Sequence, residues 1–318
     1  MPDEPTVFSR ILMATDFSSC SDDALRHAAS MAELFQAQLT LLHVLPNVHD
    51  AMAAIPAAAR WELAAGDLEA FEAALNRTSD RRLDKLLKRV KPCLIANRAT
   101  SCGTPYIRII QRVQSENYDM VLVGTHGHSG LRRLMVGSTA QRLVRHCPAP
   151  VWVVKPQRRA PPKAILTAVD FSDASQRALV AADAIARRSG AELHVMHIVD
   201  DSILAAALDA AFDIPEPPKR DVNRVMHERL AHFIAEHAPH AQNVHLRIAW
   251  GTPWARIARF AKRIKADVVV LGAIGRSGIP NLLLGNTAER VLQAAECSVL
   301  AVKPAGFVSH VQPALTVS

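Results

Sequence analysis

Short apolar runs alternate with helical patterns along the first half of the chain. Five runs rich in Val, Leu, Ile and Ala have the composition of strands buried in a parallel sheet. They are Ile11–Thr15, Leu39–Val44, Leu94–Ala99, Met120–Val123 and Val151–Val154. The segments between them carry apolar residues at helical spacing and predict helices over Asp22–Phe35, Trp61–Val90, Pro105–Ser115 and Ser138–His146. Right-handed connections between such strands predict an α/β fold with an open, doubly wound parallel sheet.

The same pattern occurs a second time. ILMATDFSSCSDDALRHAA from Ile11 returns as ILTAVDFSDASQRALVAAD from Ile165, and GTPYIRIIQRV from Gly103 returns as GTPWARIARFA from Gly251. The offset is 154 residues (165 − 11) at the first block and 148 (251 − 103) at the second. Because each copy is about half of the 318 residues, the repeat is a whole domain. We expect domains at residues 1–156 and 163–306, a proline-rich linker at 157–162 and a tail at 307–318.

Composition is that of two packed aliphatic cores. Residues of the class AVILMFWYC make up 49% of the chain and aromatic residues only 5%, which suits helices packed on buried strands. The net charge of +7 is modest, so it favours anionic ligands but does not indicate a nucleic-acid-binding protein. A basic stretch from Arg81 to Lys91 contains leucines at helical spacing. It predicts a solvated helix face, with a phosphate-rich partner as the alternative.

The cysteines and the first residues of the chain indicate the cellular compartment in which we expect the protein. Cysteines stand at five positions without regular spacing, which predicts free thiols in a reducing environment. They are Cys20, Cys93, Cys102, Cys147 and Cys297. The first residues are acidic where a signal peptide needs basic ones, and no apolar run reaches the roughly 18 residues of a membrane span. We expect a cytoplasmic protein without membrane segments.

A glycine-rich segment follows the fourth predicted strand of the first copy. In GTHGHSGLRRLMVGSTAQRLV, Gly124, Gly127 and Gly137 precede a helix that opens with Ser138 and Thr139. Glycines allow close backbone approach, and a helix N-terminus offers free N–H groups and the positive end of the helix dipole. These features predict a phosphate cradle, although a glycine turn can also serve chain geometry alone. The second copy keeps the frame at Gly272, Gly275 and Gly285.

Three shared features give the chain a family resemblance. An aspartate follows the first strand (Asp16, Asp170), the second strand ends in His43-Val44 or His197-Ile198, and the glycines have the spacing Gly-x2-Gly-x9-Gly-Ser/Thr. In these features the chain resembles a tandem member of the universal stress protein family, of its ATP-binding branch. The resemblance implies five-stranded sheets of order 3-2-1-4-5 in the adenine nucleotide alpha-hydrolase-like fold.

The resemblance also implies a nucleotide site. Adenine would lie near Asp16 and the backbone of Val44, with phosphates on the glycine loop and Ser138. The residues themselves add that His126 and His128 flank Gly127, where they could touch phosphates or assist a slow hydrolysis, or be loop histidines without a catalytic role. In the second copy Asn286 and Thr287 follow the last glycine, so Asn286 either donates to phosphate or only caps the helix. The nucleotide-binding residues expected in the two copies are Asp16, Val44, Gly124, Gly127, His128, Gly137, Ser138 and Thr139, then Asp170, Ile198, Gly272, Gly275, Gly285, Asn286 and Thr287.

Several other chemistries are excluded or left open. No GxGxxG follows the first strand and no GxxxxGK[ST] occurs, which excludes a dinucleotide dehydrogenase and a P-loop NTPase. Asp16 and Asp170 could be catalytic carboxylates, but each stands alone in its copy at a strand-to-helix turn that suits an aspartate cap, so we expect ligand contact or capping. No Cys/His spacing indicates zinc, and His43 and His197 are expected to be satisfied core or pocket residues. Mg²⁺ could accompany ATP, bound through phosphates and water.

The sequence therefore predicts a stress-associated protein that binds ATP and acts through conformation or a protein partner, without efficient catalysis. Two alternatives stay open: a slow ATPase or nucleotide-transferring enzyme, and a pseudo-dimeric scaffold whose second domain binds another ligand or none. We also expect the last strands of the two copies, Val151–Val154 and Val299–Val302, to pair as sheet edges inside the chain, and a homodimer of the chain is a further possibility.

Overall fold

The structure, a computed structural model, describes residues 8–47, 65–91, 96–125, 136–156, 158–201, 218–275 and 284–313. Its strands are β1 (Arg10–Thr15), β2 (Gln38–Leu45), β3 (Ala96–Cys102), β4 (Met120–Gly124), β5 (Val151–Val154), β6 (Ala164–Ala168), β7 (Glu192–Val199), β8 (Val244–Trp250), β9 (Val268–Gly272) and β10 (Ser298–Val302). Its helices are α1 (Ser19–Phe35), α4 (Ala65–Leu87), α5 (Pro105–Glu116), α6 (Ser138–His146), α7 (Asp173–Ser189), α9 (Lys219–His237), α10 (Pro253–Arg263) and α11 (Asn286–Ala294).

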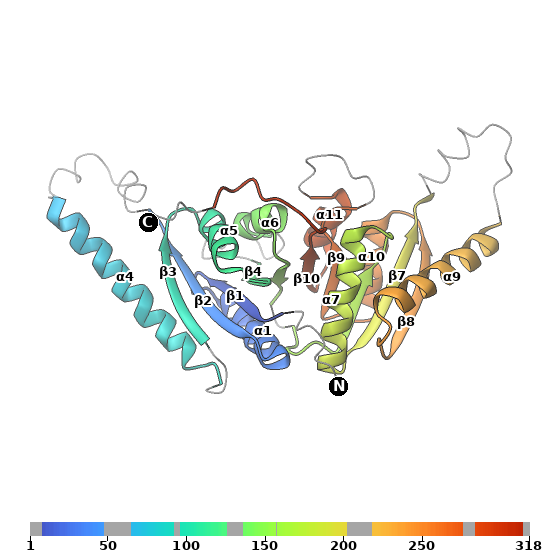
Figure 1. Ribbon diagram of the computed structural model, residues 1–318, viewed down its shortest axis with the longest axis horizontal. Helices are drawn as coiled ribbons and strands as arrows, with labels where there is room; N and C mark the ends of the chain where they lie inside the picture. Colours follow the sequence, from blue (N-terminus) through green and yellow to red (C-terminus); the bar gives the residue numbers. More distant parts are fainter. Residues whose placement is uncertain are drawn as a thin grey trace.

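The described strands form one sheet of order β3-β2-β1-β4-β5-β10-β9-β6-β7-β8 (Figure 1). Neighbours within each half pair in parallel, so each domain has the order 3-2-1-4-5 that the resemblance implies. The halves meet where β5 and β10 pair antiparallel, with Val153 opposite Val299 and Trp152 opposite Leu300. The expected pairing of the two last strands is confirmed.

Helices cover both faces of the sheet. One face packs against α1, α4, α7 and α9 and the other against α5, α6, α10 and α11. Each face carries one apolar cluster that contains residues of both domains, because the two central strands are buried on both sides. Trp152 of β5, only 1% exposed, belongs to the first cluster, whereas its neighbour Val153 belongs to the second. The two domains therefore share their cores.

The observed elements differ from the sequence expectation mainly at the outer edge. The third strand was expected at Leu94–Ala99, but β3 extends to Cys102 and pairs with β2 over its whole length. Since β3 is an edge strand with one open side, its polar residues, among them Asn97 and Ser101, do not mark it as an apolar run. The expected start of the second helix at Trp61 lies outside the described residues, within which α4 starts at Ala65.

The basic stretch is exposed on α4 as predicted, and two of its residues beyond the end of the helix form ion pairs. The apolar side chain of Leu83 is buried, while Arg89 bonds Asp22 at 2.6 Å and Lys91 just beyond the helix bonds Glu33 at 2.5 Å. The described part of the tail returns to the first domain, where Gln111 and Gln114 of α5 donate to backbone carbonyls of residues 312 and 311 (Figure 1).

The described cysteines are free thiols, and the described helices include no membrane span. Cys20, Cys102, Cys147 and Cys297 are free thiols, whereas Cys93 lies outside the described ranges. None of the helices in the described part of the chain is long and apolar enough to cross a membrane.

Two lysines connect the domains reciprocally. Lys155, after β5, donates from Nζ to the carbonyl of Ala295 at 2.6 Å, at the end of α11. Lys303, after β10, donates to the carbonyl of Arg145 at 2.8 Å, in the last turn of α6. Each domain thus caps the carboxyl end of the other domain's last helix, where the orphan carbonyls and the negative end of the helix dipole attract a donor. Burial, the largest cause, lowers the pKa of Lys303 to about 7.

This shifted pKa predicts a pH-dependent stability. Between pH 7 and pH 9 the unfolded chain retains a proton on Lys303 that the folded chain releases, so the free energy of unfolding should rise by about 2 kcal/mol. Urea unfolding measured across this range should show the rise in the natural chain. The rise should be absent in the variant Lys303→Met. It should remain in the control Lys262→Met, because Lys262 is exposed. A flat profile in the natural chain would contradict a depressed pKa. Above pH 9 the buried thiols of Cys147 and Cys297, whose pKa values burial raises to about 12 and about 11, oppose the rise.

Candidate functional site

The first domain has a cavity at the carboxyl ends of β1, β2 and β4, which is where the strand order reverses. Open α/β sheets bind their ligands at this position. The cavity has a volume of about 290 Å³. Its lining includes six described residues that the sequence predicts to bind nucleotide: Asp16, Val44, Gly124, Gly137, Ser138 and Thr139. Gly127 and His128 were nominated too and lie outside the described residues, as does the neighbouring His126.

The second domain has a matching cavity of about 550 Å³ at the ends of β6, β7 and β9. Its lining includes every residue nominated in the second copy, which are Asp170, Ile198, Gly272, Gly275, Gly285, Asn286 and Thr287. The structure therefore brings the nominated residues that it describes in each copy together around one cavity. We call these the first cavity and the second cavity.

The helices that open on the two cavities lack a side-chain cap. Gly137 is the N-cap of α6 and Gly285 the N-cap of α11, and neither helix start has a side-chain cap hydrogen bond. By contrast, Ser18 and Ser172 cap α1 and α7 with their side chains. The first N–H groups of a helix have no partner within it, so an uncapped helix start is suited to an anion. Asn286 follows the N-cap, and its expected alternative role as the capping residue is wrong.

The turn before each of these helix starts has the same geometry. The N–H of Gly137 donates to the carbonyl of Thr125 at 2.6 Å, and the N–H of Gly285 donates to the carbonyl of Ala273 at 2.7 Å. This bond ties the helix start to the residue that follows the fourth strand of each domain. The replacement of Thr125 by Ala273 leaves the turn unchanged, because the bond uses only backbone atoms.

The two aspartates have a structural role at the cavities. Oδ1 of Asp16 accepts from the N–H of Ser18 at 3.0 Å and from Oγ of Ser21 at 2.6 Å. Oδ1 of Asp170 also has two donors, but both belong to Ser172, its N–H and its hydroxyl. The aspartates therefore hold the turn before α1 and α7, whose caps are Ser18 and Ser172, and the same carboxylates line the cavities.

A phenylalanine after each aspartate is a feature that the sequence reasoning missed. Phe17 and Phe171 have φ of 62° and 64°, a left-handed conformation that is unusual for a bulky residue. Each ring lies against a histidine, Phe17 at 4.4 Å from His43 and Phe171 at 4.7 Å from His197. The repeated Asp-Phe-Ser after the first strand of each copy was the signal that could have identified them.

Arginines from the covering helices stack on these phenylalanines. Arg82 of α4 lies 4.8 Å from the ring of Phe17, and Arg229 of α9 lies 4.3 Å from that of Phe171. Arg229 and Phe171 line the second cavity, so it has a cation beside its apolar wall. This cation increases the attraction of the second cavity for an anionic ligand.

The paired histidines are held by backbone carbonyls. Nδ1 of His43 bonds the carbonyl of Thr15 at 2.7 Å, and Nδ1 of His197 bonds that of Val169 at 2.8 Å. A carbonyl only accepts, so Nδ1 is the donor in both rings. The expectation of satisfied pocket or core histidines is confirmed.

The glycines of the frame have different physical roles. A Cβ at Gly124 would lie 3.0 Å from the carbonyl group of Cys20, and one at Gly272 would lie 2.9 Å from the backbone of Ala174. Both glycines therefore allow the fourth strand to approach the start of α1 or α7, whether or not a ligand binds. A Cβ at Gly285 would meet nothing closer than 3.4 Å. Of these three positions, Gly124 and Gly272 need glycine for packing against backbone, whereas Gly285 does not.

This difference predicts opposite outcomes for two alanine variants of the second domain. Gly272→Ala forces a methyl group into the α7 backbone and should cost about 1–3 kcal/mol in the free energy of unfolding. Gly285→Ala, with φ of −74° and an ordinary contact distance, should leave stability within about 0.5 kcal/mol. Urea unfolding of both variants measures the difference. Equal losses would show that the close approach at Gly272 is not what requires glycine.

Comparison with known proteins places both domains in one family. A model described as the universal stress protein family matches residues 8–155 and again residues 162–303. A universal stress protein of Mycolicibacterium smegmatis is 30% identical over 302 residues, which cover 92% of this chain and 97% of the relative. Universal stress protein E of Escherichia coli is 30% identical over 218 residues, covering 65% of this chain and 68% of that protein. The chain belongs to the universal stress protein family.

Solved structures show the same fold. A universal stress protein from Archaeoglobus fulgidus superposes with a TM-score of 0.66 at 22% identity, covering 94% of this chain and 99% of its own. A putative universal stress protein from Pseudomonas aeruginosa gives a TM-score of 0.63 at 21% identity, with 94% of each chain covered. The similarity extends over both tandem domains.

Proposed function

We propose that this protein binds ATP in its first cavity and in its second, and acts in the cytoplasmic stress response through nucleotide-dependent conformation or a protein partner. One observation carries the proposal: each domain directs an uncapped helix start into a cavity that its own aspartate and glycines also line. The matched second cavity supports a site in both domains.

The cavity walls suit the parts of an adenine nucleotide. Leu42, Ile109 and Val123 give the first cavity an apolar wall, and Ile257, Leu271 and Met226 do so in the second. A flat heterocycle gains from such a wall, whereas phosphates require donors. The donors are the first N–H groups of α6 or α11 and the polar residues that begin each helix.

In the first domain Ser138 and Thr139 would therefore hold phosphate, and in the second Asn286 and Thr287 would do so. The amide of Asn286 replaces a hydroxyl but keeps a donor. Asp16 and Asp170 would lie toward the adenosine end, each with one oxygen already bonded to its turn. Mg²⁺ would accompany the nucleotide, bound chiefly by phosphate oxygens and water.

ATP binding can be measured one domain at a time. The natural chain should bind two ATP molecules in calorimetry with Mg²⁺, and Gly137→Val and Gly285→Val should each abolish one site, because the branched side chain lies where phosphate meets the helix start. Both glycines have φ values that valine adopts, so the fold should persist. Each variant is the control for the other domain. Unchanged ATP affinity in the double variant would contradict the proposal. If Gly137→Val abolishes ATP binding and Gly285→Val leaves it unchanged, ATP binds in the first domain and not in the second.

Any turnover of bound ATP should be slow. Efficient hydrolysis needs an oriented water, a base and groups that stabilise the transition state more than the ground state. Among the described residues lining the first cavity the polar side chains are those of Asp16 and several hydroxyl residues, and Asp16 is bonded to its turn. Single-turnover assays with saturating Mg²⁺ should leave ATP uncleaved for many minutes. A rate near ~1 per second, within the usual range for enzymes, that collapses in His126→Ala would instead establish an enzyme.

A further inference from the structure

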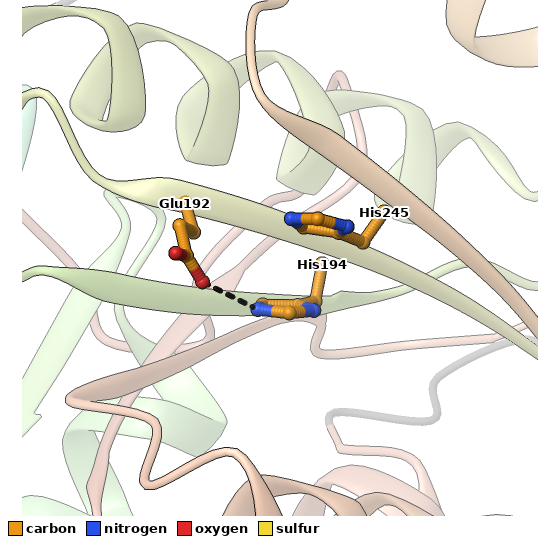
Figure 2. Close-up of side chains that lie close together, drawn as sticks. All are labelled: Glu192, His194 and His245. Atoms are coloured by element: carbon orange, nitrogen blue, oxygen red, sulfur yellow. Dashed lines mark ion pairs between the residues drawn. The ribbon is translucent and has the colours of Figure 1, made fainter.

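Three potential metal ligands meet at the outer edge of the second domain. Glu192 and His194 lie on β7, two residues apart and so on one face of the strand. His245 lies on the edge strand β8 in register with His194. Figure 2 shows the two imidazole rings one above the other, with the Glu192 carboxylate beside His194.

The geometry of this cluster is compact. The rings of His194 and His245 stack with centroids 4.8 Å apart, and Oε2 of Glu192 lies 3.4 Å from Nε2 of His194. One ligand atom of each residue lies within 4.8 Å of those of the other two. Zinc bonds of about 2.0–2.2 Å in a tetrahedral site place ligand atoms about 3.4 Å apart. To close this difference, the exposed ring of His245 has to turn out of the stack so that its lone pair and that of His194 converge on one ion, and the exposed Glu192 has to rotate toward them.

We propose that Glu192, His194 and His245 bind a divalent transition-metal ion of the Zn²⁺ class, with water in the remaining coordination position. Two imidazoles and one carboxylate are ligands that suit Zn²⁺, whereas Mg²⁺ and Ca²⁺ select sites made of oxygen atoms. The partly buried His194 gives the site its rigid ligand, because its ring also packs edge-on against Phe260 at 5.9 Å.

The charges around the cluster are compatible with a metal. Burial first, and then the neighbouring His245, lower the pKa of His194, a direction that favours the neutral ring required of a ligand. Arg247 and Arg263 are close by, but both guanidinium groups lie over the ring of Phe260, at 4.9 and 4.7 Å. They do not occupy the ligand atoms, although their positive charge reduces the affinity that the three ligands alone would give.

This site is distinct from the nucleotide site. His194 lies four residues before Ile198, which lines the second cavity, and four residues of strand span about 13 Å. The cluster is at the amino end of β7, whereas the cavity opens at the carboxyl ends of the strands. The metal is therefore not the ion that would accompany ATP.

The first domain shows that the fold does not require these residues. At the positions matching Glu192, His194 and His245 it has Gln38, Thr40 and Asn97, and Thr40 pairs with Asn97 in the same register. Thr40 accepts a hydrogen bond from the hydroxyl of Tyr118 at 2.8 Å.

The residue matching Tyr118 in the second domain is Ala266. The second copy thus has three potential metal ligands where the first has neutral residues, and a small side chain where the first has a tyrosine.

The test uses the full chain, freed of metal with a chelator, and ZnCl₂ alone as the probe in calorimetry. We expect one tight site per chain and an about 100-fold or greater loss of affinity in the triple variant Glu192→Gln/His194→Thr/His245→Asn, which copies the first domain. The single variant His245→Asn, on an exposed edge position, should also weaken binding. Co²⁺ in place of Zn²⁺ should give a tetrahedral absorption spectrum in the natural chain and not in the triple variant.

A matched control is available on α9. His232 lies 3.9 Å from a carboxylate oxygen of Glu236 and is highly exposed, but it does not belong to the three-ligand cluster. His232→Asn should leave the tight site unchanged. The proposal is overturned if the natural chain binds no Zn²⁺, if His245→Asn binds as tightly as the natural chain, or if His232→Asn loses the site. Gly137→Val and Gly285→Val should retain Zn²⁺ binding whatever their effect on ATP.

Discussion

The antiparallel pairing of β5 with β10 is the contact on which the arrangement of the molecule depends. An open parallel sheet has two edges with unpaired backbone groups, and a buried apolar strand at such an edge requires a partner. Each domain supplies that partner to the other, so two five-stranded sheets become one. The pairing also brings the last helix of each domain within reach of a lysine of the other, and it merges the apolar layers on both faces.

The two cavities use one local design. An aspartate accepts from the turn at the start of one helix, a glycine lets the fourth strand approach that helix, and a second glycine begins another helix without a side-chain cap. The design depends on backbone geometry more than on side chains, which is why the second domain keeps it although Asn286 stands where the first domain has Ser138. What differs is the surrounding wall, where Arg229 and Phe171 join the lining of the second cavity.

The domains have diverged most clearly away from the cavities. The face of β7 and β8 that carries Glu192, His194 and His245 corresponds to a neutral, hydrogen-bonded face in the first domain. Glu192 and His245 are exposed, so exchanging these two side chains has little effect on the shared core, whereas His194 on the inner strand β7 is partly buried. A duplicated domain can therefore acquire a second ligand site without disturbing the first.

The sequence by itself determined the parts of the protein that rest on local periodicity and on the repeat. These include the parallel strands, the two domains, the glycine frame and the residues around each cavity. Only the tertiary structure decided which roles those residues have: Gly124 and Gly272 allow close packing, Asp16 supports a turn, and Gly285 rather than Asn286 is the N-cap residue of α11, which has no side-chain cap. The structure alone also paired His194 with His245, which no ligand spacing along the chain could reveal, because strand register joins residues far apart in sequence. Edge strand β3 escaped accurate prediction since solvent on one side removes the apolar signal of a buried strand.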